Sequence, residues 1–287
     1  MSRLGTKFAA LKKKKALLAY LVAGDPDKEI TVDLMHAMVA SGADAIELGV
    51  PFSDPEAEGP VIQLAHERAL ANQVSLADCF NMLAKFRERD QQTPVILMGY
   101  LNPIESMGYD VFAERSAAAG ADGMIIVNLP PEEASELSGS LQRHDLDLVF
   151  LLAPTTTDTR AEMICDKSSG FVYYVSLKGT TGAATIDVDD VASKMSRFRS
   201  MSSLPILVGF GIRDGETAAG VGQHADGVVV GSAIVDLMAK NAADPARIIE
   251  AVSSLISEIR LALDDLCLLY TSPSPRDLST SRMPSSA

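Results

Sequence analysis

The chain has 287 residues, of which 47% are hydrophobic and 22% charged, and its formal net charge is −13 at pH 7. A net negative chain is a poor candidate for binding nucleic acid or an anionic membrane. No apolar stretch approaches the ~20 residues that cross a bilayer, and the first residues lack the apolar core of a signal peptide, so we expect a globular protein of the cytoplasm.

Eight short runs rich in Val, Ile and Leu follow one another along the chain. Segments with apolar residues at helical spacing lie between them, for example 29–41, 76–89 and 131–143. Continuous apolar runs indicate strands buried on both faces, and eightfold alternation with helices favours one α/β domain, a (β/α)8 TIM barrel, over an open doubly wound sheet. Residues 2–15 are expected to form an extra N-terminal helix over the barrel floor. The predicted strands are 17–22, 45–49, 95–99, 123–127, 146–152, 171–175, 206–209 and 227–230.

The composition changes at Cys267. Residues 267–277 resemble the translation of a transposase-type sequencing adaptor, and the remainder is rich in Ser, Pro and Arg without apolar periodicity. We therefore predict a barrel domain over 1–266 and a non-native tail over 267–287. A natural disordered tail is the alternative.

Two acids stand near the ends of predicted strands, where barrels carry their chemistry. Glu47 lies inside the apolar strand 45–49, so burial should raise its pKa and allow proton exchange near neutrality. The alternative is an outward-facing residue paired with a helix Lys or Arg. Glu58 follows in a proline-rich acidic loop, 50–60, that is either solvated or held over the barrel mouth near Glu47. Two carboxylates in unlike environments are typical of acid/base catalysis.

Three glycine-containing segments, 178–183, 209–213 and 231–234, cluster late in the chain. Glycines after the last strands let backbone N–H groups approach a phosphate, and a helix beginning beyond Gly231 would add its dipole. Plain turns are the alternative. We therefore predict a phosphorylated small-molecule substrate. Lys178 is a weaker candidate for a Schiff base, because its Gly/Thr loop is a poor place to desolvate an amine.

No metal site is predicted. The histidines lack the spacing of metal ligands, and no motif for a dinucleotide or ATP is present. Cys79 and Cys165 are interpreted as small core residues, and no disulfide framework is expected. The histidines are expected at surface or helix-terminal positions: His36, His66, His144 and His224.

Residues 46–59, Ile-Glu-Leu-Gly-Val-Pro-Phe-Ser-Asp-Pro-Glu-Ala-Glu-Gly, resemble the tryptophan synthase alpha chain family. The likeness extends over 1–266 in family order and spacing, with further blocks at 24–26, 98–102, 129–132, 179–182 and 209–212. It implies an eightfold barrel and a lyase of tryptophan biosynthesis. The implied reaction is a retro-aldol cleavage of indole-3-glycerol phosphate to indole and glyceraldehyde 3-phosphate.

The resemblance also implies roles for single residues. Glu47 matches the principal acid/base, and Glu58 matches a second carboxylate that hydrogen-bonds the indole N–H. Thr181 matches a mobile-loop residue whose hydroxyl reaches that second carboxylate. Pocket positions are matched by Tyr20, Ile62, Leu97, Tyr100 and Tyr173, and the phosphate cradle by Gly182, Phe210, Gly211, Gly231 and Ser232. The family needs no cofactor in this chain. Its partner is a pyridoxal-phosphate (PLP) beta chain, which receives indole through a tunnel, so an alpha2beta2 heterotetramer is expected.

Three positions depart from the family pattern. Glu58 stands where Asp is usual, and ~1 Å displacements of catalytic groups can cost ~100-fold in rate. Glu56 replaces an apolar residue and adds a charge that should raise the pKa of a neighbouring acid. Asn128 replaces a common Asp near the substrate mouth and the beta-chain contact.

Two alternative functions remain open: a non-catalytic allosteric subunit of a beta chain, and another phosphate-binding barrel, an isomerase or cyclase.

Overall fold

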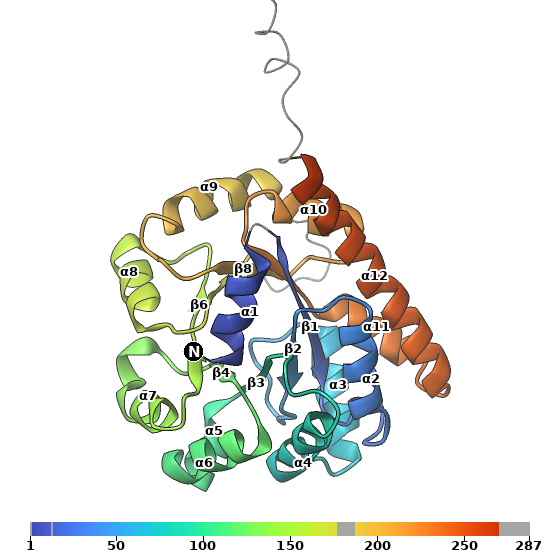
Figure 1. The fold of residues 1–287 in the computed structure, drawn as a ribbon. Coiled ribbons are helices and arrows are strands. Elements are labelled where there is room, and N and C mark those ends of the chain that lie inside the picture. The colour runs from blue at the N-terminus through green and yellow to red at the C-terminus, as the bar shows by residue number, and fades with distance from the viewer. Residues whose placement is uncertain (1, 13, 177–186, 270–287) are drawn as a thin grey trace, which may run out of the picture.

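The computed structural model describes residues 2–12, 14–176 and 187–269, and in this part of the chain a ring of helices surrounds a parallel sheet (Figure 1). Every strand pairs with its neighbours in parallel, in the order β5-β4-β3-β2-β1-β9-β8-β7-β6. The strands are β1 (Ala16–Val22), β2 (Ala45–Gly49), β3 (Val95–Gly99), β4 (Gly123–Ile126), β5 (Asp147–Val149), β6 (Leu151–Leu152), β7 (Val172–Val175), β8 (Ile206–Gly209) and β9 (Gly227–Val230).

The two ends of this sheet meet at Phe150. β5 pairs with β4 and β6 pairs with β7, and only Phe150 separates β5 from β6. The backbone N–H of Tyr173 donates to the Phe150 carbonyl at 3.2 Å. The predicted fifth strand, 146–152, is therefore one run that changes partner halfway and closes the barrel. The prediction of a (β/α)8 barrel is confirmed.

Helices follow the strands as the periodicity predicts. The segment 131–143 differs, because it opens with a 3-10 turn (Pro131–Glu133) after Pro130, and the α-helix starts at Ser135. The helices are α1 (Arg3–Leu11), α2 (Ile30–Ala40), α3 (Pro60–Ala71), α4 (Leu76–Arg87), α5 (Leu101–Met107), α6 (Tyr109–Ala119), α7 (Ser135–Gln142), α8 (Asp158–Lys167), α9 (Val188–Phe198), α10 (Gly215–Gly222), α11 (Ser232–Lys240) and α12 (Pro245–Leu269).

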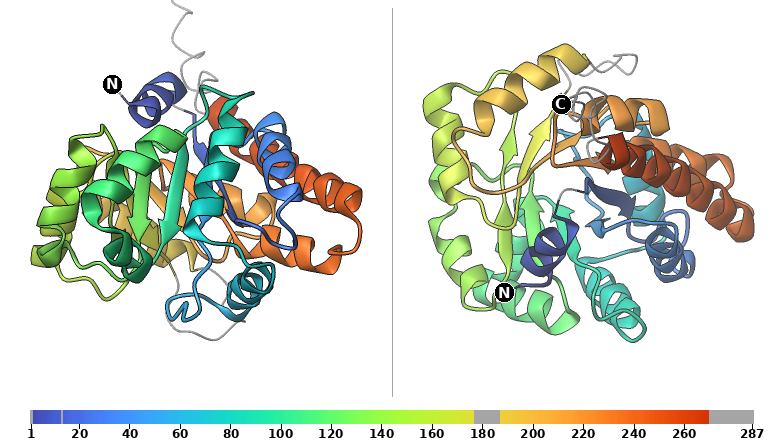
Figure 2. Two further views of the ribbon diagram at one scale, coloured as in Figure 1. Left: turned by 90° about the horizontal axis from the view of Figure 1, so that it is seen from below. Right: turned by 45° about the horizontal axis from the view of Figure 1, so that its top comes forward.

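The N-terminal helix α1 lies across one end of the barrel (Figure 2, left). Arg3 donates to the Asp122 carboxylate at 2.7 Å. Asp122 is buried and also accepts from Arg87 and from the backbone N–H of Val95, both at 2.8 Å. Because Asp122 precedes β4 and Val95 opens β3, α1 covers the N-terminal ends of the strands. The predicted helix over the floor is present, and the opposite end of the barrel is left for the loops that follow the strands.

The C-terminal helix α12 continues to Leu269, beyond the predicted domain boundary at 266. The rest of the predicted tail, 270–287, lies outside the described residues. Within the described residues, no helix is both long enough and apolar enough to cross a membrane. Both predicted core cysteines, Cys79 and Cys165, are buried.

Candidate active site

Glu47 is held inside the barrel by its strand. The side chain is 1% exposed, and its Oε1 atom has no hydrogen-bond partner within the described part of the chain. Burial, assisted by the nearby charge of Glu58, raises the pKa of Glu47 to about 8. The alternative of an outward-facing residue paired with a helix cation is therefore wrong. A carboxyl group in this setting keeps its proton at neutral pH and can give it to a bound molecule.

Glu58 is positioned by the loop between β2 and α3. Its side chain is 8% exposed, and burial raises its pKa to about 7. The Tyr100 hydroxyl accepts from the backbone N–H of Ala57 at 3.2 Å, and the Tyr100 ring stacks on Phe52 with centroids 4.8 Å apart. Gln63 donates its side-chain amide to the Glu58 carbonyl at 2.8 Å. These contacts, together with the prolines, hold the loop over the barrel, so it is not a freely solvated acidic loop.

The two acids are more alike than the sequence suggested. We expected unlike environments, but burial is the main cause of the raised pKa in both Glu47 and Glu58. Two buried carboxyl groups with pKa values near neutrality share protons readily, because ionising one disfavours ionising the other. The charge of the exposed Glu56 is not among the causes of either raised pKa. Burial raises the pKa of Tyr100, and the charges of Glu58 and then Glu56 add to this effect.

Two tyrosine hydroxyls complete the group around the acids. Burial and the charges of Glu47 and Glu58 raise the pKa of both Tyr20 and Tyr173. In the parallel register Tyr20 lies beside Glu47, and side chains of register partners project from the same face. The structure therefore brings together both predicted acids and two of the predicted pocket residues, and Tyr100 joins them through the loop.

Leu97 is not brought to this site. The register pairs Leu97 with Leu48 and pairs Glu47 with Ile96, so Leu97 projects from the opposite face of the sheet. It lines a small apolar space together with Ile104 of α5 and Phe112 of α6. Met98, the partner of Gly49 in the register, shares the face of Glu47 instead. The other predicted apolar contact, Ile62, is buried on α3 one turn before His66.

Backbone groups after β8 and β9 form the candidate phosphate cradle. Phe210 and Gly211 have φ angles of 70° and 80°, and Ser176 donates to the carbonyls of Gly209 and Phe210 at 2.8 and 2.9 Å. A left-handed Phe is uncommon and such strain concentrates at functional sites. α11 begins at Ser232 after Gly231, and no side chain of the described residues caps it, so its first N–H groups can bind an anion. Thr181, Gly182 and Lys178 lie outside the described residues.

The sequence interpretation of one polar residue, His66, is wrong. His66 was expected at a surface or helix-terminal position, but it is 2% exposed in the middle of α3 and contacts Tyr20. The one sequence signal for this buried position is that His66 lies two turns into the helix that follows the acidic loop 50–60. Asn128 accepts from the backbone N–H of Leu101 at 2.8 Å, at the start of α5, a contact that the more common Asp would also make.

No cluster of three His, Cys, Asp or Glu suited to a metal ion occurs among the described residues.

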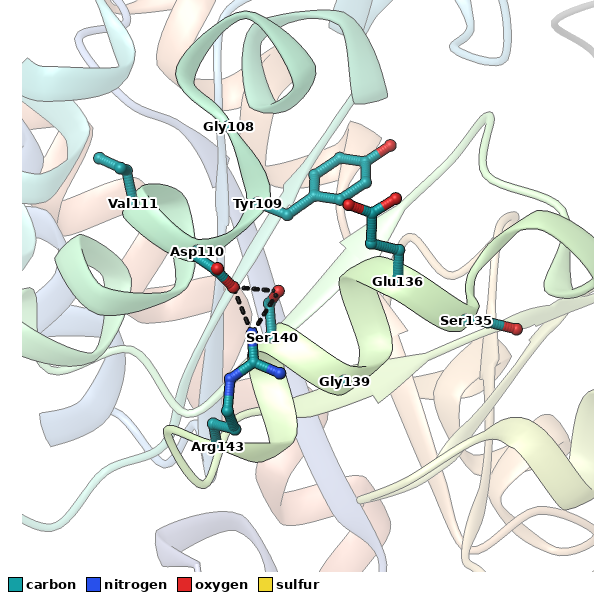
Figure 3. A pocket seen from close by; sticks show the side chains of 9 residues that line it. All are labelled: Gly108, Tyr109, Asp110, Val111, Ser135, Glu136, Gly139, Ser140 and Arg143. Carbon is teal, nitrogen blue, oxygen red and sulfur yellow. Dashed lines mark hydrogen bonds and ion pairs between the residues drawn. The ribbon is translucent and has the colours of Figure 1, made fainter.

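A second cavity, of about 450 Å³, lies between α6 and α7 (Figure 3). Asp110 at the start of α6 accepts from Ser140 at 2.6 Å and also pairs with Arg143 at the end of α7. Asp110, Ser140 and Arg143 are thus bonded to one another, and none of the predicted site residues lines this cavity.

Comparisons with known proteins agree with this arrangement. A family model described as tryptophan synthase alpha chain matches residues 8–263. The tryptophan synthase alpha chain of Thioalkalivibrio sulfidiphilus is 56% identical over 266 residues, which cover 92% of this chain and 100% of the relative. That of Marinobacter nauticus is 55% identical over 93% of this chain and 99% of its own. The crystal structure of tryptophan synthase subunit alpha from Legionella pneumophila has a TM-score of 0.85 at 46% identity, over 92% of this chain and 99% of that chain.

One further solved structure was determined as an assembly. The tryptophan synthase complex from Pyrococcus furiosus has a TM-score of 0.77 at 36% identity, and the match covers 86% of this chain and 98% of that chain.

Proposed function

Because this chain belongs to the tryptophan synthase alpha chain family, we propose that Glu47 and Glu58 carry out its lyase reaction, the cleavage of indole-3-glycerol phosphate to indole and glyceraldehyde 3-phosphate. The observation that carries these roles is the shared burial of two carboxyl groups at one end of the barrel, with pKa values raised to about 8 and about 7. Such groups hold and release protons at neutral pH.

Breaking the bond between indole C3 and the glycerol chain requires three things. C3 must gain a proton, the adjoining glycerol hydroxyl must lose one as it becomes the aldehyde, and the positive charge that develops on the ring must be stabilised. Protonated Glu47 gives its proton to C3, and its carboxylate then takes the hydroxyl proton, which restores the acid. Reprotonation is favoured because the buried carboxylate has no partner on Oε1 in the described chain. Ionised Glu58 accepts the indole N–H and balances the charge on the ring.

The phosphate end of the substrate is assigned to the late loops. Gly231, Ser232, Phe210 and Gly211 would offer backbone N–H groups and the uncapped start of α11. A Cβ atom built on Gly231 would lie 3.5 Å from the Tyr20 ring, and Tyr20 is the register partner of Glu47. Tyr20 therefore stands between the phosphate cradle and the acids, along the path that the glycerol chain would take.

We further propose a PLP-dependent beta chain as the partner, in an alpha2beta2 assembly in the cytoplasm. The solved Pyrococcus furiosus relative is described as a complex, which supports a multisubunit enzyme. A non-catalytic subunit that only activates a beta chain is the second candidate, and the substitution at Glu58 favours it. A buried acid at Glu47 whose Oε1 atom has no hydrogen-bond partner among the described residues is costly to keep without a chemical role, and this argues against the second candidate.

The test is indole release from indole-3-glycerol phosphate by the purified chain, with and without an added beta chain. We expect release by the chain alone and a strong rise with the partner. A folded chain that releases no indole in either condition, yet stimulates the beta reaction, would overturn the catalytic proposal and leave the activating subunit.

A further inference from the structure

His66 is a buried imidazole behind Tyr20 that the proposed reaction does not use. It lies on α3, which packs against β1 and α11, and its side chain is 2% exposed. The ring touches the site on two sides. The backbone N–H of Phe52 lies 3.1 Å from Nδ1, and the Tyr20 hydroxyl oxygen lies 3.5 Å from Nε2.

These two contacts decide which nitrogen of His66 carries the proton. Since the Phe52 N–H donates to Nδ1, that nitrogen must have a free lone pair. Burial lowers the pKa of His66 to about 4, so the ring is neutral at the pH of catalysis. A neutral imidazole has one N–H, and here it must be on Nε2, directed at the Tyr20 oxygen.

The orientation of the Tyr20 hydroxyl follows. A tyrosine hydroxyl has one proton to donate, and its oxygen accepts from His66, so the O–H bond must point away from the imidazole. The Tyr20 oxygen lies against the end of β2, since a Cβ atom on Gly49 would be 2.5 Å from it. Its register partner Glu47 projects from the same face of the sheet, so the hydroxyl proton is directed toward the site interior. Burial, with the nearby Glu58 and Glu47, raises the pKa of Tyr20, so the hydroxyl keeps this proton.

We propose that His66 is a positioning residue that directs the Tyr20 hydroxyl, so that Tyr20 donates a hydrogen bond to a hydroxyl oxygen of the substrate's glycerol chain. This inference rests on the proposed function, because the chain's path between the acids and the phosphate cradle comes from it. Tyr20 contacts the substrate and acts in binding and orientation, whereas His66 acts only through Tyr20.

Two amide substitutions separate this role from simple packing. His66→Gln places an amide N–H where Nε2 was and keeps the donor to Tyr20. His66→Asn places its amide near Nδ1 and keeps only an acceptor for the Phe52 N–H. We expect Asn to lower kcat/KM for indole release about tenfold, the loss typical of one hydrogen bond, and Gln to retain most of it. The reverse order, with Asn tolerated and Gln inactive, would show that His66 merely satisfies the Phe52 backbone.

A double-mutant cycle adds the link to Tyr20. Tyr20→Phe should lower kcat/KM by a similar factor, and His66→Asn added to it should cause no further loss. If the fold-losses of the two single variants instead multiply in the double variant, the two residues act independently and the proposal is wrong. Urea unfolding of each variant checks that the fold is kept.

The tautomer is measured apart from activity, by the ring ¹⁵N chemical shifts of His66 in the full chain. We expect a protonated Nε2 whose shift moves in Tyr20→Phe, and a protonated Nδ1 would refute the inference. This spectrum reports the protonation site of His66 even if the wild-type chain releases no indole. Absence of indole release would count against the proposed function alone.

Discussion

Glu47→Gln removes the charge of the principal acid and keeps its shape. If Glu47 exchanges protons with the substrate, the variant should lose indole release almost completely, while the backbone groups that hold the phosphate stay in place. The same substitution should stabilise the fold, because the wild-type acid ionises freely in the unfolded chain but is kept protonated by burial in the folded chain. An amide resembles the protonated carboxyl, so the comparison isolates ionisation.

The size of this stabilisation depends on pH and follows from the raised pKa of Glu47, from 4.5 to about 8. Below pH 4.5 both folded and unfolded chains are protonated, and the acid makes no difference. As pH rises, the unfolded chain releases the proton and the folded chain keeps it, so the free energy of unfolding falls. Between pH 4.5 and pH 7, about 2.5 pH units at ~1.4 kcal/mol each lower the free energy of unfolding by ~3 kcal/mol. Above pH 8 the folded chain also ionises, and the decrease in the free energy of unfolding levels off at ~5 kcal/mol.

Urea unfolding of the wild type and Glu47→Gln at pH 5, 7 and 8.5 measures the difference. We expect the variant to be more stable by less than ~1 kcal/mol at pH 5 and by ~3 kcal/mol at pH 7. Glu56→Gln is the matched control, since it makes the same chemical change at an exposed position nearby and should show no such trend. A stability difference that stays constant with pH, or indole release at the wild-type rate, would refute the reasoning.

Three further predictions concern the acid loop, a strand end and the tail. Glu58→Asp should retain or raise kcat, because the loop stays anchored by Tyr100; a ~100-fold loss would show that the backbone has adapted to the longer acid. Gly209→Ala puts a Cβ atom 1.9 Å from the Tyr173 hydroxyl oxygen, so it should lower kcat/KM and reduce the free energy of unfolding by ~1–3 kcal/mol. Gly139→Ala is the control: its Cβ atom would lie 3.8 Å from the nearest side-chain atom, and indole release should be unchanged. Removing 270–287 should alter neither thermal stability nor indole release, and a clear loss of either would contradict the predicted non-native tail.

Hydropathy was enough to locate the strands because barrel strands are covered on both faces. The runs at 45–49 and 206–209 match β2 and β8 in full, since turn residues bound them on each side. The split at Phe150 was not predictable in this way. The run 146–152 is apolar on both sides of the split, and a change of hydrogen-bonding partner leaves no trace in hydrophobicity.

The site was only partly predictable for a related reason. Glu47 stood out because a carboxylate inside an apolar strand has few structural explanations. Leu97 and Met98 are both apolar in an unbroken run, so nothing in their own chemistry says which faces the barrel interior, and a shift of one residue exchanges the faces. His66 was missed because its significance lies in contacts with Tyr20 and Phe52, which the fold brings together from outside its helix.

The two tyrosines at the site follow one geometric rule. Tyr20 of β1 is the register partner of Glu47, and its hydroxyl reaches Gly49, two residues further along β2. Tyr173 of β7 is the partner of Leu207, and its hydroxyl reaches Gly209, again two residues further, on β8. Side chains on strands lean along the strand direction, and a ring of this length spans about two residues. A glycine is required where each hydroxyl arrives, because any Cβ atom would collide with it. The terminal glycines of β2 and β8 therefore serve the tyrosines of the neighbouring strands, and through them bring two hydroxyls to the acid pair.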